Sequence, residues 1–173
     1  EYASKINELG TQYGRLQDIS TEVKRIAVRF PQSTAVKRQL AYLLWLNRNE
    51  TEALESQQQV VLLSPVAADW HNLAVLSLSR SNSETACYAL ERYFLLGSPS
   101  ENDTWFVYVG LLHQLHDYSG LIALVNALFQ KKTPEIGSLL LRSALFLLKE
   151  INKTEAASAS ARSIVDNISS EAV

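Results

Sequence analysis

The sequence has no methionine, one cysteine, four prolines and six glycines among its 173 residues. The single cysteine, Cys87, excludes an internal disulfide and supplies too few thiolates for a structural zinc site. Because Cys87 follows Ala86 in an apolar segment, we expect a buried and inert thiol. The longest hydrophobic run, Leu139 to Leu148, is interrupted by Arg142 and Ser143. It is well short of the roughly 20 residues that span a membrane, so we expect no membrane insertion.

Charged residues of either sign are few, and they form no block. The net charge is −2, without the basic patch that attracts nucleic acid or an anionic membrane, so we expect no nucleic-acid partner. The sequence also lacks a Gly-rich phosphate loop, a G-x-S-x-G motif and an H-E-x-x-H motif. We therefore predict that the protein is not an enzyme and needs no cofactor.

The chain begins at Glu1 and carries no signal sequence. We interpret it as a mature protein or an excised fragment, which leaves both the cytoplasm and the periplasm open as its compartment.

One cluster has a spacing that suits a metal ion. His113 and His116 share one face of a helix, and Asp117 follows them directly. Two imidazoles and a carboxylate can hold a transition metal, but the same residues also make an ordinary polar helix end. The polar helix end is the better interpretation, and we predict no metal site.

The prolines reveal an internal repeat. They are Pro31, Pro65, Pro99 and Pro134, spaced by 34, 34 and 35 residues. Other features recur with them: Trp70 and Trp105, and the pattern Asn-x-x-x-Ala, which begins at Asn49, Asn82 and Asn152. A period near 34 residues with a turn in the middle of each unit indicates an array of helix–turn–helix repeats.

We predict an all-α fold, a right-handed superhelix of about five helical hairpins in a single domain. The five units are residues 1–33, 34–66, 67–101, 102–136 and 137–173. Turns are expected at Gly14, at Asn47-Arg48-Asn49, at Ser81-Asn82-Ser83 and at His116-Asp117. Asparagine suits such turns because it tolerates the left-handed conformation and its side chain can bond the local backbone. Gly10 is expected to weaken the first helix.

Apolar residues at helical spacing predict the packing faces of these hairpins. In chain order the predicted packing residues are Ile19, Val23, Ile26 and Phe30; Val36, Leu40, Leu43 and Leu44; Ala53, Leu54, Val60, Val61 and Leu63; Trp70, Leu73 and Ala74; Ala86, Leu90 and Tyr93; Trp105, Tyr108, Val109 and Leu112; Leu121, Val125 and Leu128; and Leu140, Ala144 and Leu147. In the unit 34–66, the apolar pattern of the second helix is interrupted by Gln57, Gln58 and Gln59. A last helix, rich in alanine and serine from Ala156, has little to bury on its outer side and suits a cap.

The units resemble tetratricopeptide repeats. Units of that family have the pattern Trp-x-x-Leu-Gly-x-x-Tyr, followed by alanine, an aromatic residue and proline. Trp70 with Leu73 and Trp105 match the first part, and the alanines after the turns and the recurring prolines match the second. The aromatic residue is missing in every unit, where Gln57, Leu90, Val125 and Ser160 stand. The pentatricopeptide type, which binds single-stranded RNA, is the alternative, and the acidic balance of this chain argues against it.

The resemblance implies that the first helices of the units line a concave groove for a peptide or helix of a protein partner. The positions that line it in the family correspond here to a largely apolar set, with Tyr42, Trp45 and Phe106 as aromatic anchors and Arg38 as a charged one. We select as groove residues Arg38, Tyr42, Trp45, His71, Phe106, His113 and Lys149. The clamp with which some members hold acidic chaperone tails is disfavoured, because only Asn72 matches it and Asp103 would repel the tail.

Two functions stay open at this point. The first is a non-enzymatic scaffold that binds a protein or peptide in the groove. The second is a structural spacer in a larger bacterial assembly for secretion, pilus formation or polysaccharide export, as the resemblance also allows. Neither end of the chain offers many large apolar groups, so we expect a monomer, or a weak dimer through the groove.

Overall fold

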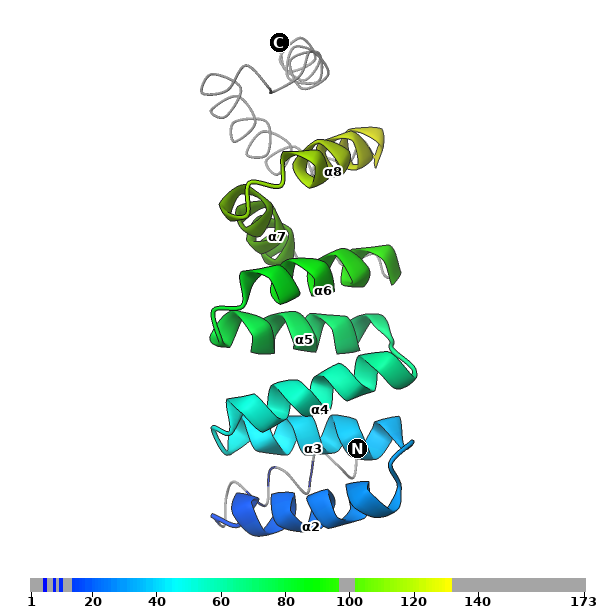
Figure 1. Cartoon of the computed structure of the whole chain (residues 1–173), viewed down its shortest axis with the longest axis vertical. Coiled ribbons are helices and arrows are strands. Elements are labelled where there is room, and N and C mark those ends of the chain that lie inside the picture. Colours follow the sequence, from blue (N-terminus) through cyan, green and yellow to red (C-terminus); the bar gives the residue numbers. More distant parts are fainter. Residues whose placement is uncertain (1–4, 6–7, 9, 11–13, 97–101, 132–173) are drawn as a thin grey trace. The chain divides into compact units, whose positions relative to one another are not determined.

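The computed structural model describes residues 5, 8, 10, 14–96 and 102–131 (Figure 1). Within these residues the chain forms seven α-helices and no strand, which confirms the all-α prediction. The helices are α2 (Leu16–Arg29), α3 (Thr34–Leu46), α4 (Glu50–Leu63), α5 (Ala67–Ser79), α6 (Ser83–Leu96), α7 (Asn102–Gln114) and α8 (Tyr118–Lys131). The predicted fifth hairpin, residues 137–173, lies outside the described residues. No helix among the described residues is long and apolar enough to cross a membrane.

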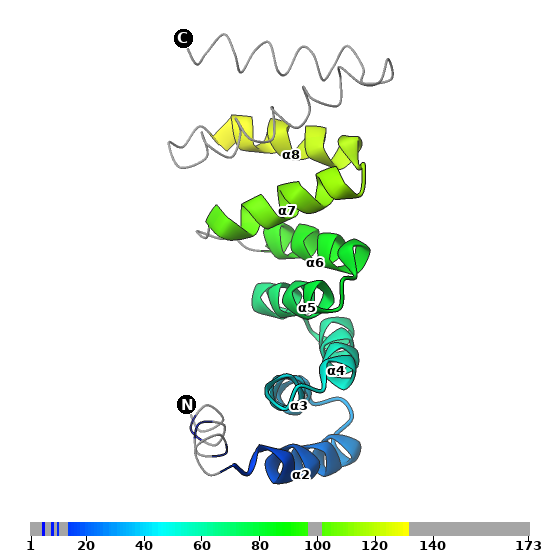
Figure 2. The same cartoon turned by 90° about the vertical axis from the view of Figure 1, so that its left-hand side faces the viewer.

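The chain divides into two compact units, residues 1–98 and 99–173. In the first unit, helices α2 to α6 are stacked one on another in chain order (Figure 1). Seen from the side, α3 and α5 lie on one side of this unit and α4 on the other (Figure 2). In the second unit, α7 packs against α8. The prediction of a single domain in a right-handed superhelix concerns the placement of the two units and stays a prediction.

One type of turn joins the helices within each hairpin. Arg48, Ser81 and His116 adopt left-handed conformations, with φ of 60°, 55° and 55°. The amide of the next residue in each case bonds back to a carbonyl five residues earlier, as in Asn49 N–H to Leu44 O at 2.9 Å. This is the Schellman arrangement that ends a helix by satisfying its last carbonyls. Gly14, with φ of 66°, occupies the same position before α2, and the predicted turns are thus confirmed.

The asparagines in these turns have a different role from the predicted one. Asn49 is not left-handed, since its φ is −89°. Instead its side-chain oxygen accepts from the Glu52 amide, and Asn82 accepts in the same way from the Thr85 amide at 3.1 Å. Each asparagine therefore caps the N-terminus of the second helix, while the residue before it adopts the strained conformation. The expected bond to the local backbone is confirmed and the left-handed conformation of asparagine is wrong.

Most of the predicted packing residues form the core. The buried ones are Leu40, Leu43, Leu44, Ala53, Val60, Val61, Leu73, Ala74, Ala86, Leu90, Tyr108, Val109, Leu112 and Leu121. Cys87 is buried, as expected. Among the described side chains two assignments are wrong: Phe30 is 59% exposed and Leu63 is 37% exposed, while the side chains of Val125 and Leu128 lie outside the described set. Phe30 is the residue after α2 and Leu63 is the last residue of α4, so both lie beyond the helix faces that the neighbouring helices cover.

Gly10 packs closely against α2. It is buried, and a Cβ atom at this position would lie 2.6 Å from Cδ1 of Ile19. A glycine here lets the backbone approach α2 closely, which a larger residue would prevent without a shift of Ile19.

Candidate functional site: a hollow between α3 and α5

The surface of the first unit has a hollow of about 140 Å³ where α3 and α5 lie on the same side. Eight residues line it, namely Arg38, Ala41, Tyr42, Trp45, Gln57, Asn72, Val75 and Leu76. The alternation of helices explains this lining, because α3 and α5 are the first helices of successive hairpins and α4 lies behind them. A cavity of about 150 Å³ holds a benzene molecule, so the hollow has room for one apolar side chain.

Exposed aromatic side chains form one wall of the hollow. Tyr42 is 46% exposed and Trp45 is 41% exposed. Their ring centroids lie 6.0 Å apart with the planes tilted by 38°, a favourable aromatic pair. Val75 on α5 is 42% exposed. Buried Ala41 and Leu76 also line the hollow, so this part of its wall is apolar.

Arg38 lies in the hollow but is bonded within the chain. Its Nε and Nη2 atoms donate to the two carboxylate oxygens of Asp69, each at 2.7 Å, and Nη2 also donates to the carbonyl of Ser64 at 3.2 Å. The hydrogen bonds to Asp69 raise the pKa of Arg38 above its usual value. Since Asp69 compensates the charge of Arg38, this part of the hollow presents a neutralised pair to any ligand.

Asp69 connects three helices. Its carboxylate also accepts from the Val66 amide at 2.9 Å, which caps the start of α5. Its backbone carbonyl accepts from Nε2 of the buried Gln57 on α4 at 2.7 Å. The sequence pattern missed both residues, because Gln57 looks like an interruption of α4 and Asp69 looks like a solvated first-turn acid. Each is satisfied by a residue distant in the sequence: the Asp69 carboxylate by Arg38, 31 positions earlier, and the Gln57 amide by the Asp69 carbonyl, 12 positions later.

Within the first unit, three of the predicted groove residues line the hollow together: Arg38, Tyr42 and Trp45. His71 does not line the hollow; its ring lies 5.1 Å from the Tyr93 ring of α6. Phe106 and His113 are on α7, in the second unit. Lys149 lies outside the described residues. Asn72 and Val75 line the hollow beside the three, although they are not among the seven groove residues selected from the sequence.

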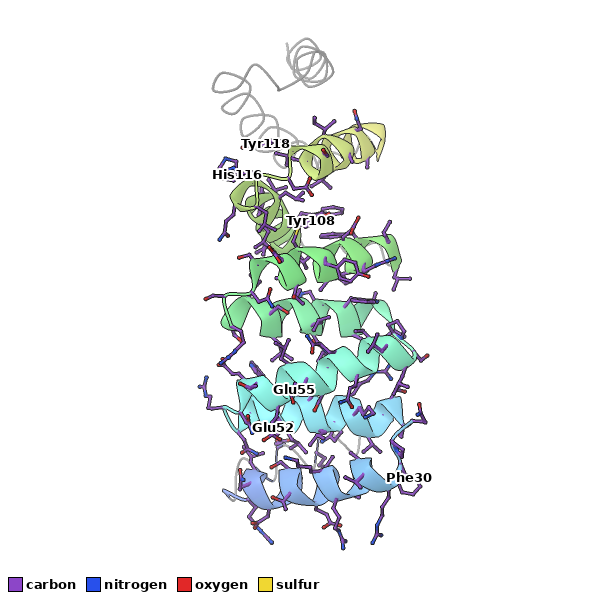
Figure 3. The ribbon with its side chains drawn as sticks, viewed as in Figure 1. Phe30, Glu52, Glu55, Tyr108, His116 and Tyr118 are labelled. Carbon is purple, nitrogen blue, oxygen red and sulfur yellow. The ribbon has the colours of Figure 1, made fainter. Side chains whose placement is uncertain are left out.

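His116 belongs to the turn between α7 and α8 (Figure 3), whereas His113 lies in the last turn of α7. His116 has a left-handed backbone, and its Nδ1 atom lies 2.9 Å from the Tyr118 hydroxyl. Asp117 accepts a hydrogen bond from the Gly120 amide at 2.9 Å, as the N-terminal cap of α8. In the part of the chain that the structure describes, no three histidine, cysteine or acidic side chains converge on a possible metal ion.

A second hollow lies over α2, α3 and α4, and two of its charged lining residues pair with each other. Lys24 of α2 and Glu52 of α4 form an ion pair at 2.5 Å, and Lys37 bonds to Gln59. Two hydrogen bonds lower the pKa of Glu52: the bond from Lys24 has the larger effect and the bond from Asn49 the smaller one. Glu52 and Glu55 both lie on α4 (Figure 3). The Lys24–Glu52 pair joins α2 to α4, and the Lys37–Gln59 bond joins α3 to α4.

Comparison with known proteins supports the architecture. No family profile and no curated protein matches the sequence. Solved structures do match its fold. YrrB, described as a TPR protein with an unusual peptide-binding site, superimposes with a TM-score of 0.62 at 9% identity, over 93% of this chain and 81% of YrrB. MamA has a TM-score of 0.59 at 14% identity, over 94% of this chain and 92% of MamA.

The TPR-like repeats of a Podosopora anserina kinesin light chain are a third match. They give a TM-score of 0.56 at 15% identity, over 99% of this chain and 95% of theirs. Identities this low show the fold, and the fold agrees with the 34-residue period and with the hairpins. The chain is therefore a divergent example of the tetratricopeptide repeat fold.

Proposed function

We propose that the protein is a non-enzymatic scaffold that binds a peptide or helix of a partner protein in the hollow between α3 and α5. The observation that carries this proposal is the pair Tyr42 and Trp45, two large side chains that remain exposed beside a preformed apolar hollow. Tyrosine and tryptophan are enriched among the residues that dominate binding energies at interfaces.

The charge of the hollow indicates the chemistry of the ligand. Among the described residues that line it, Arg38 alone is charged, and it is paired with Asp69. An acidic tail would gain little there, whereas an apolar side chain would displace water from Trp45, Val75 and Leu76. Peptide binding by YrrB, a protein of the same fold, supports the same kind of use.

A peptide selection tests the proposal. Random linear peptides displayed on phage are selected on the whole chain, and the enriched peptides are then titrated by fluorescence polarisation against variants. We expect enriched peptides to share an apolar anchor residue. We also expect the double variant Tyr42→Ala/Trp45→Ala to lose at least about 2 kcal/mol, or roughly thirtyfold, of binding free energy.

Tyr88 supplies a matched control. It is 47% exposed, as Tyr42 is 46% exposed, but it lies on α6 and does not line the hollow. Tyr88→Ala should bind the selected peptides like the wild type. If the double variant retains wild-type affinity while its circular dichroism spectrum is unchanged, the hollow is not the binding site and the proposal fails.

A further inference from the structure

A second apolar surface in the first unit is separate from the hollow. The next-to-last residues of α2, α4 and α6 are Val28, Leu62 and Leu95, and they are 78%, 83% and 70% exposed. They occupy the same position in successive hairpins. Each of these three helices therefore has an exposed aliphatic side chain at the same position near its C-terminal end.

Further exposed apolar residues adjoin these positions in the sequence. We call the whole set the apolar edge: Val28, Phe30, Leu62, Leu63, Val66, Leu95 and Leu96. The C-terminal ends of α2, α4 and α6 lie along one side of the unit (Figure 1), and Phe30 marks that side in Figure 3. None of the seven residues lines the hollow between α3 and α5.

The apolar edge has the composition of an interface. The segment 57–68 supplies the centre of the apolar edge and contains no charged residue. Charged side chains stand at the two ends of the edge, with Arg29 on α2 and Glu91 on α6. A charge-depleted apolar centre with a charged rim is the usual anatomy of a protein–protein contact. Apolar patches of more than a few hundred Å² are uncommon on soluble monomers.

The arrangement of the edge fits a second copy of itself. Along the apolar edge, the C-terminal end of α4 lies between the C-terminal ends of α2 and α6. A two-fold rotation about the α4 end therefore brings the α2 end of one copy against the α6 end of the other. Leu62 and Leu63 then meet their own equivalents at the axis, as an isologous contact requires.

The same rotation pairs opposite charges. It brings Arg29 of one copy towards Glu91 of the other, and within the described residues neither side chain has an ion-pair partner. Arg92, next to Glu91, is held over the Tyr88 ring at 5.2 Å. The two charged ends of the edge are therefore complementary across the two-fold axis and not within one chain.

The exposed area is of the size that a dimer needs. Seven large side chains at roughly 100 Å² each approach the roughly 800 Å² per partner of a standard interface. We propose that this protein forms a two-fold symmetric homodimer through the apolar edge. This differs from the monomer, or weak dimer through the groove, that we expect from the sequence, and it leaves the hollow open for a ligand.

Sedimentation velocity over a micromolar concentration series tests the proposal with the whole chain. We expect the wild type to sediment as a dimer at the upper concentrations and Leu62→Glu to sediment as a monomer throughout. Since Leu62 is 83% exposed, the substitution removes almost no packing within the chain. Thr51→Glu is the control, because it adds the same charge at an exposed position at the other end of α4 and should leave the dimer intact.

A charge swap tests the two-fold pairing itself. Arg29→Glu and Glu91→Arg should each weaken the dimer several-fold, because each places like charges together across the axis, and the double variant should restore it. A wild type that stays monomeric at every concentration, or a Leu62→Glu variant that still dimerises, would overturn the proposal. A double variant no tighter than either single variant would overturn the two-fold arrangement.

Discussion

Two ion pairs of the first unit differ in burial, and this decides how much each contributes. The carboxylate side of the Arg38–Asp69 pair is only 3% exposed, whereas Lys24 and Glu52 are 58% and 39% exposed. Removing one partner of a buried pair leaves a charge without solvent or counter-ion, which is costly. Removing one partner of an exposed pair lets water take its place, and such pairs contribute about 0–1 kcal/mol.

This contrast gives a residue-scale prediction. Arg38→Met should lower the free energy of unfolding by about 3 kcal/mol, because it strands the buried Asp69 carboxylate. Lys24→Met, the matched control, should lower it by less than about 1 kcal/mol. Urea unfolding followed by circular dichroism measures both. Equal losses in the two variants would show that Asp69 is not buried as described.

The same residues show where prediction from sequence stops. Periodicity identifies Leu40, Leu44 and Ala53 as core residues, because apolar spacing carries that information locally. It cannot identify Gln57 or Asp69 as buried, because a polar side chain is buried only where a distant partner satisfies it. The resemblance to tetratricopeptide repeats predicts Arg38 as a ligand-binding residue, and in the structure two of its guanidinium nitrogens bond to Asp69 of the same chain.

At the scale of the elements, the hairpin turns are the most regular feature. Gly14, Arg48, Ser81 and His116 all have positive φ at spacings that follow the repeat. Only the first of them is glycine, the residue that adopts this conformation without steric cost. The other three keep this strained backbone conformation because it allows the hydrogen bonds that end the preceding helix to form.

Ser81→Gly should therefore stabilise the protein. The substitution relieves strain at φ of 55° but increases the freedom of the unfolded chain, and we expect a net gain of up to about 1 kcal/mol. Ser81→Val should cost more than 1 kcal/mol, since a β-branched residue tolerates this conformation least. The midpoint of thermal unfolding reports both. A lower midpoint for Ser81→Gly than for the wild type would contradict the assigned turn.

The positions of the turns can be predicted from the sequence, but the backbone conformation of each turn residue cannot. Proline and asparagine spacing places the breaks correctly, because both residues act within a few positions of themselves. Which residue of the turn is left-handed depends on how the helix before it ends, and Asn49 and Asn82 cap the following helix instead. A cap and a left-handed turn residue favour the same residue types, so composition alone cannot separate the two roles.

At the scale of the whole molecule, the repeat produces two surfaces from one pattern. The first helices of the hairpins expose Tyr42, Trp45 and Val75 around a hollow, and the ends of the second helices expose the apolar edge. A stack of hairpins buries its core between neighbours and leaves both surfaces open along its length. We assign the first surface to a ligand and the second to another copy of the chain.

The three tryptophans allow the most direct measurement of the central claim. Trp45 lines the hollow, Trp70 is on α5 but does not line it, and Trp105 is on α7 in the second unit. In ¹H–¹⁵N spectra each indole N–H gives its own signal, which a single Trp→Phe variant assigns. On titration with a selected peptide, the account predicts that the Trp45 signal shifts progressively to saturation while those of Trp70 and Trp105 change much less. Saturation by the peptide with an unmoved Trp45 signal would contradict it.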